Sequence, residues 1–479
     1  MKVLAVASEA YPLIKTGGLA DVVGALPGAL APHGVETTVL LPGYGPILRA
    51  LSGGKVLHRY TDLMGVKARL LVFANAPFPL IVLDAPDLFG RDGGPYGNDA
   101  GVDWPDNWRR FAALGRAGAD LAAGVAKAYR PDLLHAHDWQ GAMAPAYMRY
   151  SGLDIPSVVT VHNIAFQGRF DAAVFAALDL PAAAFAVDGV EYFGGVGFLK
   201  AGLHTADAIT TVSPTYAAEI GDATFGMGLE GLINARRADV CGIVNGIDTV
   251  VWDPATDPYL HANYTAATLR RRAENRQAIE AEFALTPGKG PLFCVVSRLT
   301  WQKGMDVLAE TLEDLVAMGG RLALLGSGDV ALEAAFVAAA QRHPGRIGVR
   351  IGYDEALSHL LQGGADAILV PSRFEPCGLT QLYGLRYGCV PVAARTGGLA
   401  DTIIDANEAA LSGGVATGYL FDGVTRANLT RAIARVLDGF SRPKVWRALK
   451  RQGMRCDFSW SHSAQRYADL YQSLVKRNP

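Results

Sequence analysis

The sequence predicts an α/β protein built from two doubly wound, Rossmann-like domains. Short apolar runs alternate with helical patterns along almost the whole chain, which is typical of parallel sheets covered on both faces. The chain has 479 residues, too many for one hydrophobic core. A polar stretch, residues 248–291, interrupts the alternation once, and a second series of strands and helices follows it. We therefore expect two such domains facing each other across a deep cleft.

The first series begins at the N-terminus. Its expected strands are residues 3–7, 36–41, 69–74, 80–84, 132–136, 157–161, 208–212 and 240–244. We expect a surface loop over residues 92–106, which are rich in Gly, Pro and Asp, and then a long helix to about residue 128. The expected strands of the second series are residues 292–297, 321–325, 347–351, 367–370 and 390–394.

The domain boundaries follow from this order. We predict an N-terminal domain over residues 1–245, a C-terminal domain over residues 246–457, and a terminal segment over residues 458–479 that contains one amphipathic helix. Doubly wound domains bind ligands beyond the carboxyl ends of their strands, so polar side chains at strand ends are the first candidates for a site.

Composition excludes several classes of partner. The formal net charge of −2 and the pI of about 6.6 argue against nucleic acid and against an anionic membrane surface. The five cysteines form no Cys-x-x-Cys pair, which argues against a disulfide framework or a zinc site. No targeting signal precedes the first strand, and no apolar run reaches the ~18 residues of a membrane span. We expect a cytoplasmic protein, and nothing in the sequence indicates its oligomeric state.

The most informative stretch is residues 371–380, between a buried strand and a helix. Its carboxylate, Glu375, and its thiol, Cys377, would lie at the carboxyl edge of the sheet, near the N–H groups of Leu379 and Thr380 at the helix start. An ordinary strand-to-helix turn would look similar. Cys377 has no His or Asn arrangement beside it that is specific to thiol catalysis, so we favour an inert thiol over a nucleophile.

Two cations follow the first strand of the second domain. Arg298 and Lys303 are five positions apart across a loop and could converge on one anion, such as a diphosphate. The alternative is a pair of solvated surface cations. No Asp-x-Asp pair occurs to hold Mg²⁺ on a sugar diphosphate, so cations of the chain and helix dipoles would have to neutralise a leaving phosphate.

Histidines end two strands of the first domain. We expect His135 and His137 to point to opposite faces of the sheet and not to share an ion, with His135 in the core. His137, Asp138 and His162 are expected to face the cleft.

Two glycine motifs remain. Thr16-Gly-Gly-Leu-Ala-Asp21 recurs as Thr396-Gly-Gly-Leu-Ala-Asp401, and paired glycines at a helix start allow a ligand to approach the backbone closely. Two similar helix starts without a ligand are the alternative. Residues 326–331 fit G-x-G-x-x-A, the dinucleotide fingerprint, which keeps an NAD-dependent dehydrogenase open.

Taken together, these residues resemble one family, the bacterial glycogen synthases and plant starch synthases. The resemblance rests on motifs in the family's order from end to end: Lys15-Thr-Gly-Gly-Leu, His137-Asp138-Trp139, Val161-His162-Asn163, Asn245-Gly-Ile-Asp248, Ser297-Arg-Leu-Thr-Trp-Gln-Lys-Gly304, Arg373-Phe-Glu-Pro-Cys-Gly-Leu-Thr380 and Arg395-Thr-Gly-Gly-Leu-Ala-Asp401. It implies the two-Rossmann (GT-B type) glycosyltransferase architecture, with the C-terminal helix crossing back to the first domain.

The resemblance also implies an activity. Enzymes of this family transfer glucose from ADP-glucose to the non-reducing end of an α-1,4-glucan such as glycogen, with retention of the α configuration, and release ADP. The first domain would hold the glucan and the second the nucleotide sugar. We expect neither a metal nor pyridoxal phosphate as cofactor.

Individual residues take roles by the same resemblance. The expected contacts to the nucleotide and its phosphates are Arg298, Lys303, Leu379, Thr380, Lys15, Gly18, Asp21 and Tyr353, the last by stacking on the adenosine. The expected residues around the transferred glucose are Glu375, His162, Asn163, Asn245, Cys377, Gly378 and, near the reacting centre, Asp138. Trp139 and Tyr96 are candidate flat platforms for the glucan. Tyr383 stands eight positions after Glu375, where the wider clan often has a second Glu.

Two mechanisms would retain configuration. In a double displacement, Glu375 would be the nucleophile. In front-face attack, which we favour, Glu375 orients the sugar and offsets its developing positive charge while Arg298 and Lys303 stabilise the leaving ADP. The rival classes are a nucleotide-sugar binding protein without turnover, the dehydrogenase, and a glucan phosphorylase, which would need a lysine carrying pyridoxal phosphate.

Overall fold

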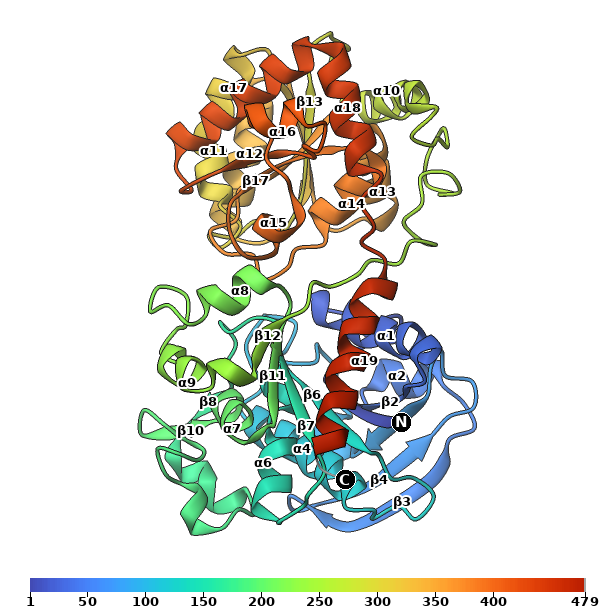
Figure 1. Cartoon of the computed structure of the whole chain (residues 1–479), viewed down its shortest axis with the longest axis vertical. Coiled ribbons are helices and arrows are strands. Elements are labelled where there is room, and N and C mark those ends of the chain that lie inside the picture. The colour runs from blue at the N-terminus through green and yellow to red at the C-terminus, as the bar shows by residue number, and fades with distance from the viewer. Residues whose placement is uncertain (478–479) are drawn as a thin grey trace. The chain divides into compact units, whose positions relative to one another are not determined.

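The computed structural model describes residues 1–477 and divides into two compact units, each built around its own largely parallel sheet (Figure 1). Unit 1 comprises residues 1–246 together with the C-terminal residues from Trp460 onward, and unit 2 comprises residues 247–459. The α/β class with two Rossmann-like sheets, predicted from the alternation of strands and helices, is confirmed.

Unit 1 has a nine-stranded sheet in the order β12-β11-β7-β6-β1-β2-β5-β4-β3. Its strands are β1 (Lys2–Val6), β2 (Glu36–Pro42), β3 (Lys55–Leu63), β4 (Val66–Val72), β5 (Leu80–Asp84), β6 (Leu133–His137), β7 (Ser157–Val161), β11 (Ala208–Thr211) and β12 (Val240–Gly242). A separate small sheet consists of β8 (Arg169–Phe170), β9 (Glu191–Tyr192) and β10 (Gly195–Gly197).

One edge of the larger sheet departs from the prediction. β3 pairs with β4 and β4 with β5 in antiparallel fashion, and the sequence did not indicate β3. Most side chains of β3 are partly or fully exposed, because it is an edge strand, so it lacks the apolar run by which buried strands are recognised.

Helices cover both faces of this sheet. The helices of unit 1 are α1 (Gly18–Leu30), α2 (Gly45–Ala50), α3 (Pro86–Phe89), α4 (Asn107–Ala122), α5 (Asp138–Gly141), α6 (Met143–Tyr150), α7 (Phe198–Thr205), α8 (Pro214–Glu219), α9 (Glu230–Ala235) and α19 (Trp460–Arg477). α4 ends before residue 128, where we expected it to end, because Gly124 adopts a left-handed φ of 84° that stops the helix.

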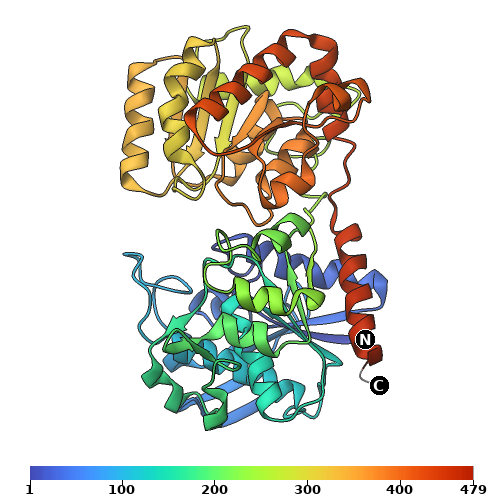
Figure 2. The ribbon, with the colours of Figure 1, turned by 60° about the vertical axis from the view of Figure 1, so that its left-hand side comes forward.

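The C-terminal helix belongs to the core of unit 1. α19 lies beside α1 (Figures 1 and 2), and its Tyr467, Tyr471 and Leu474 are buried with Leu26 of α1 and Val3 of β1. The amphipathic pattern at the end of the chain therefore encodes a helix that completes one face of the first sheet.

Unit 2 has a six-stranded, fully parallel sheet in the order β15-β14-β13-β16-β17-β18. The strands are β13 (Leu292–Val296), β14 (Arg321–Gly326), β15 (Ile347–Ile351), β16 (Ala367–Val370), β17 (Val390–Ala394) and β18 (Tyr419–Phe421). Numbered within the unit, this is the order 3-2-1-4-5-6 of dinucleotide-binding folds. The strand order therefore reverses between β13 and β16, and the loops after these two strands border the ligand-binding crevice of such folds.

Two layers of helices enclose the sheet of unit 2. One buried cluster joins α11 (Met305–Ala317), α12 (Val330–Arg342), α17 (Arg426–Ser441) and α18 (Pro443–Gly453) to one face. A second cluster joins α10 (Arg272–Glu282) and α13 (Glu355–Gly364) to the other. The remaining helices are α14 (Thr380–Tyr387), α15 (Gly397–Thr402) and α16 (Glu408–Ser412). Within residues 1–477 no helix has the length and apolarity that crossing a membrane requires.

Candidate active site

Unit 2 contains a cavity at the reversal of its strand order. It is lined by residues from the loop after β13 and from the loop after β16, among them Lys303, Ser372, Glu375, Gly378, Leu379 and Thr380. The sequence predicted that these two loops carry a site, and the structure brings them together at the position that the fold reserves for ligands.

A short ion pair lies in this cavity. Lys303 Nζ is 2.5 Å from Glu375 Oε2, and both side chains are largely buried. Ser372 Oγ donates a second hydrogen bond to the same oxygen at 2.8 Å. Glu375 Oε1 forms no hydrogen bond with the described residues, so it is available to a ligand. The Lys303 ammonium and the Glu375 carboxylate thus lie side by side. The ammonium can bind an anion, and the carboxylate can accept a hydrogen bond from a hydroxyl.

The start of α14 forms another wall of the cavity. No side chain caps this helix, whose N-cap residue is Leu379. Gly378, just before it, has a left-handed φ of 72°, and an added Cβ there would lie 2.4 Å from Gln381 Oε1. Gln381 Nε2 in turn donates to the carbonyls of Cys377 and Gly378. The uncapped N-terminus therefore offers N–H groups and a partial positive charge to an anion.

Residues that follow β13 hold the loop that carries Glu375. Arg373 forms a two-point ion pair with Asp306 at 2.7 Å, and its guanidinium lies 4.4 Å from the centre of the Trp301 ring. The Arg373 N–H also donates to the carbonyl of Gln302. The anchoring role of Asp306 was not predicted, although the sequence places this carboxylate in the first turn of α11.

The second glycine motif lies behind the same loop. The Gly398 N–H donates to the Glu375 carbonyl at 3.0 Å, and a Cβ on Gly397, which has φ +44°, would come within 2.0 Å of that carbonyl oxygen. In unit 2 the motif therefore allows two backbones to pack closely, a structural purpose that the sequence analysis did not anticipate.

Two predicted nucleotide contacts of unit 2 lie at its surface. Arg298 is exposed, does not line the cavity, and donates a long hydrogen bond of 3.4 Å to Gln302. Tyr353, after β15, is 72% exposed. In this structure Arg298 contacts Gln302 and Lys303 contacts Glu375, so the two cations share no hydrogen-bond partner among residues 1–477.

In unit 1 the strand order reverses between β1 and β6, and polar residues follow both strands. Asp138 follows β6 and has a left-handed φ of 49°, an uncommon conformation for a residue with a side chain. Its Oδ1 accepts the N–H of His162 at 2.6 Å and that of Asn163 at 3.4 Å. His137 Nδ1 lies 3.0 Å from His162 Nε2. The predicted grouping of His137, Asp138 and His162 is present.

The predicted orientation of the histidines is wrong. Side chains two positions apart on a strand point to the same face, and the rings of His135 and His137 are 4.0 Å apart. His135 is nevertheless a core residue, as predicted, because it lies 2.6 Å from Thr160 Oγ1 and 2.7 Å from the hydroxyl of Tyr471. Within the described chain, no group of three or more His, Cys, Asp or Glu side chains has the arrangement of a metal site.

Burial shifts the pKa values of the three histidines and of Asp138. Loss of solvation lowers the pKa of His135 and of His162 to about 3 and holds that of His137 well below its ordinary value. Burial raises the pKa of Asp138 to about 7, against the opposing hydrogen bonds from the N–H groups of His162 and Asn163. The three imidazoles are therefore neutral at pH 7, and Asp138 titrates near that pH.

The raised pKa of Asp138 leads to a stability prediction for Asp138→Asn. Between its ordinary pKa of 3.8 and about 7, the folded state holds a proton on Asp138 that the unfolded state has lost. The free energy of unfolding of the wild type therefore falls by about 1.4 kcal/mol per pH unit from this group as pH rises through that window. The variant has no carboxyl group at this position, so it lacks this contribution to the pH dependence of stability. Its stability relative to the wild type should rise by that slope with increasing pH, as measured by urea unfolding at several pH values.

A matched control removes a charge elsewhere in unit 1. Asp87→Asn replaces an exposed carboxylate on α3, so it controls for the general effect of losing one negative charge. The histidines contribute equally to the wild type and to both variants, and their effect cancels in the difference. A stability difference for Asp138→Asn that does not change with pH would contradict the raised pKa.

The predicted glucan platforms differ in their surroundings. Trp139 is only 8% exposed and packs against Phe111, Phe170 and Phe198, so little of its ring is open to a glucan here, and its role as a platform stays a prediction. A ring that suits a sugar suits a hydrophobic core equally well, and the sequence did not distinguish the two. Tyr96 is partly buried, and its hydroxyl donates to the carboxylate of Glu9.

The other predicted residues of unit 1 lie near strand and helix ends. Lys15 Nζ pairs with Asp21 Oδ1 at 2.8 Å, and Gly18 is the first residue of α1. Asn245 is 5% exposed, and its buried Oδ1 has no hydrogen-bond partner within residues 1–477, so this acceptor is available to a ligand donor.

The dinucleotide fingerprint is not a binding site in this structure. Residues 326–331 do connect β14 to α12, but the carboxylate of Asp329 caps the helix by accepting the N–H groups of Ala331 and Leu332. A pyrophosphate would meet this negative charge in place of open N–H groups.

Tyr383 makes its aromatic contact within unit 2. Its ring stacks on Trp252, with ring centres 3.6 Å apart and an interplanar angle of 12°, and His359 stacks on the other face of the same indole. The residue eight positions after Glu375 therefore anchors α14 to the segment that begins unit 2.

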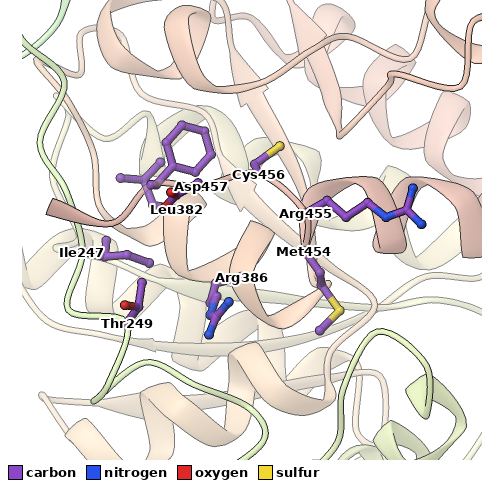
Figure 3. Close-up of a pocket in the computed structure, with 9 residues that line it drawn as sticks. Ile247, Thr249, Leu382, Arg386, Met454, Arg455, Cys456 and Asp457 are labelled. Carbon is purple, nitrogen blue, oxygen red and sulfur yellow. The ribbon is translucent and has the colours of Figure 1, made fainter. Parts of the chain in front are cut away.

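A second pocket of unit 2 lies beside α14, on the side of Leu382 and Arg386 (Figure 3). It is lined by Leu382 and Arg386 of the helix and by residues of segments 247–249 and 454–458. Arg386 already pairs with Asp253 at 3.1 Å. None of the predicted site residues lines this pocket.

Comparisons with known proteins identify the family models that match each part of the chain. Residues 2–235 match the family model of the starch synthase catalytic domain, and residues 277–452 match that of glycosyl transferases group 1. These matches and the two Rossmann-like units define a glycosyltransferase of the GT-B class.

Relatives narrow the class further. The chain is 62% identical over 479 residues to the glycogen synthase of Novosphingobium aromaticivorans, with 99% of each chain covered, and 59% identical over 479 residues to glycogen synthase 1 of Rhizobium meliloti, with 100% of each covered. The catalytic domain of starch synthase IV from Arabidopsis thaliana, solved with ADP and acarbose bound, superposes with a TM-score of 0.89 at 31% identity and 99% coverage of both chains. The chain belongs to the glycogen synthase family.

A more distant likeness concerns the fold alone. Sucrose-phosphate synthase from Thermosynechococcus elongatus superposes with a TM-score of 0.62 at 18% identity, covering 99% of both chains. Membership of the glycosyltransferase class and the capped helix at Asp329 together rule out the dehydrogenase interpretation.

Proposed function

We propose that this chain is a cytoplasmic glycogen synthase that transfers glucose from ADP-glucose to the non-reducing end of an α-1,4-glucan with retention of configuration. The observation that carries the proposal is the Lys303–Glu375 pair in the cavity beside the uncapped start of α14. An anion-binding helix end and an ammonium suit a diphosphate, and a free carboxylate oxygen suits a sugar hydroxyl.

In this proposal, unit 2 binds the nucleotide sugar and unit 1 binds the glucan. Lys303, Arg298 and the N–H groups of Leu379 and Thr380 bind the diphosphate, and Tyr353 stacks on the adenine. The glucose contacts are Glu375, Gly378, Cys377, His162, Asn163 and Asn245. Lys15, Gly18 and Asp21 contribute to the nucleotide from unit 1, and Asp138 acts near the reacting centre.

The proposed reaction is front-face displacement. The bond between the anomeric carbon and the ADP oxygen breaks as the acceptor hydroxyl attacks from the same side, and the departing phosphate takes the hydroxyl proton. Lys303 then stabilises charge that grows on ADP, and Glu375 offsets the positive charge of the sugar. The proposal requires neither a metal nor pyridoxal phosphate, because cations of the chain and a helix dipole act on the leaving group.

Incorporation of labelled glucose into glycogen tests the function. We expect transfer from ADP-glucose, slower transfer from UDP-glucose, and α-1,4 linkages in the product. Binding of ADP-glucose without incorporation would instead support a non-catalytic nucleotide-sugar binding protein. Faster transfer from UDP-glucose would overturn the assignment of the adenine donor.

A further inference from the structure

A buried carboxylate outside the predicted site lies at the strand reversal of unit 1. Glu9 follows β1 and is 2% exposed. It forms no ion pair with any residue in the described part of the chain, and neutral donors satisfy it instead. A buried carboxylate without a cation is costly, so the contacts that it makes call for an explanation.

These contacts join three segments of the chain. Thr16 donates both its hydroxyl, at 2.6 Å from Glu9 Oε1, and its N–H, to Oε2. Tyr96, from the loop between α3 and α4, donates its hydroxyl to Oε1 and lies 2.8 Å from Ser8 Oγ. Glu9 therefore ties the turn before α1 to the end of β1 and to a distant loop.

Other contacts hold the residues on either side of Thr16: the Tyr11 N–H donates to the Ala20 carbonyl at 2.9 Å, and Lys15 pairs with Asp21 at 2.8 Å. The N–H and the hydroxyl of Thr16 itself hydrogen-bond to Glu9 alone among residues 1–477. The N-cap residue of α1, Gly17, has no side chain to cap the helix. Apart from chain neighbours and the backbone of α1, no atom of residues 1–477 lies within 4 Å of the position that a Cβ would take on Gly17 or Gly18. The turn is thus open on the side where its backbone could approach a ligand.

The body of α1 is held independently of Glu9. Its Val22, Leu26 and Leu30 are buried in the same cluster as residues of α19 and of the central strands. Loss of the Glu9 contacts should therefore loosen the turn and leave the helix in place. This separation distinguishes a positioning role from a purely structural one.

We infer that Glu9 is a positioning residue for donor binding: through Thr16 it holds the Lys15–Asp21 turn in the conformation that receives the nucleotide. The inference rests on the proposed function. Glu9 does not itself touch the donor. Its two oxygens are occupied by Thr16 and Tyr96, and a ligand would meet the backbone and Lys15 on the open side of the turn.

The test is kinetic and calorimetric. We expect Glu9→Ala to raise the KM for ADP-glucose and the dissociation constant of ADP by about 10- to 100-fold, because three hydrogen bonds to a charged group are lost, two of them from Thr16. The KM for glycogen should stay within about threefold of the wild type, as should kcat at saturating donor. Glu9→Gln should recover part of the loss, because its amide oxygen still accepts the Thr16 hydroxyl.

Two further variants sharpen the result. Thr16→Val removes one of the contacts to Glu9 without altering the glutamate, and it should raise the ADP dissociation constant by a smaller factor. Asp84→Asn alters a buried carboxylate of the same sheet that pairs with Arg69, and it should leave both donor constants unchanged. Near-wild-type ADP affinity in folded Glu9→Ala overturns the inference. Should that variant fail to fold, unchanged affinity in Thr16→Val overturns it.

The test of the Glu9 role and the test of the proposed function can fail independently. A wild type that binds ADP but incorporates no glucose contradicts the function, while the ADP affinities of the variants still decide the role of Glu9. A wild type that incorporates glucose, together with a Glu9→Ala variant of unchanged KM, contradicts the role of Glu9 alone.

Discussion

Glu375→Ala is expected to abolish glucosyl transfer, with incorporation below about 10⁻³ of the wild-type rate and unit 2 still folded. Glu375 has one oxygen held by Lys303 and Ser372 and the other open to the cavity, which suits a group that orients a sugar hydroxyl. Truncation removes the carboxylate and leaves the Lys303 ammonium without its partner. Loss of a preorganised charge at the reacting centre and loss of sugar orientation act together, so the effect exceeds that of a single donor.

The measurement is labelled glucose incorporation, with circular dichroism and thermal unfolding to verify the fold. Glu282→Ala is a suitable control, because Glu282 is an exposed carboxylate of unit 2 that pairs with Arg350 at the surface. Residual activity of Glu375→Ala within tenfold of the wild type would show that Glu375 does not act at the reacting centre.

The same residue separates the two mechanisms. Glu375→Gln keeps one oxygen to accept the Ser372 hydroxyl, and its NH2 group in the other position can donate to a sugar oxygen, so front-face attack predicts a slow but measurable enzyme. A double displacement predicts none, since an amide is a poor nucleophile. Isolation of a glucosyl ester on Glu375 from a slowed variant would overturn front-face attack.

Lys303→Ala is expected to lower kcat by about 10²- to 10³-fold, the usual effect of losing one preorganised donor to a developing charge. The ammonium is 2.5 Å from Glu375 and lines the cavity beside the start of α14, where the leaving diphosphate would gain charge. The variant also leaves Glu375 largely buried with only Ser372 as a partner. Both effects lower the rate.

The assay measures kcat with ADP-glucose, and Lys303→Arg tests whether charge alone is sufficient. Lys444→Ala, which removes an exposed lysine of α18, is the control. A Lys303→Ala enzyme within threefold of the wild-type kcat would exclude the role. Arg298→Ala in the same assay shows whether the exposed arginine contributes as much as the buried lysine.

Several features of the site were predictable because they depend on local order along the chain. Apolar runs followed by polar residues located the ends of β13 and β16, and the fold rule for such ends brought Lys303 and Glu375 to one place. The same rule applied to β1 would have identified Glu9, which follows that strand as Asp138 follows β6. The position of Glu9 directly after a buried strand is visible in the sequence, but its hydrogen bonds to Thr16 and Tyr96 are not.

Other features depend on contacts between residues far apart in the chain. Trp139 is buried because three phenylalanines surround it, and two of them, Phe170 and Phe198, come from segments well beyond it in the sequence. The second glycine motif packs behind Glu375, and Arg298 extends into solvent while Lys303 does not. Residue type and spacing are the same for a buried ring and an exposed one, so spacing could not decide these cases.

The sequence by itself determined the α/β class, the two strand–helix series, the loops that hold the site and, through ordered motifs, the family. These follow from periodicity and from short-range patterns, which backbone geometry converts directly into strands, turns and helix starts. Only the tertiary structure decided that Lys303 pairs with Glu375, that Trp139 is a core residue, and that Glu9 holds the turn before α1. Those outcomes depend on which side chains meet across the fold, and that is set by packing and by the satisfaction of buried polar groups.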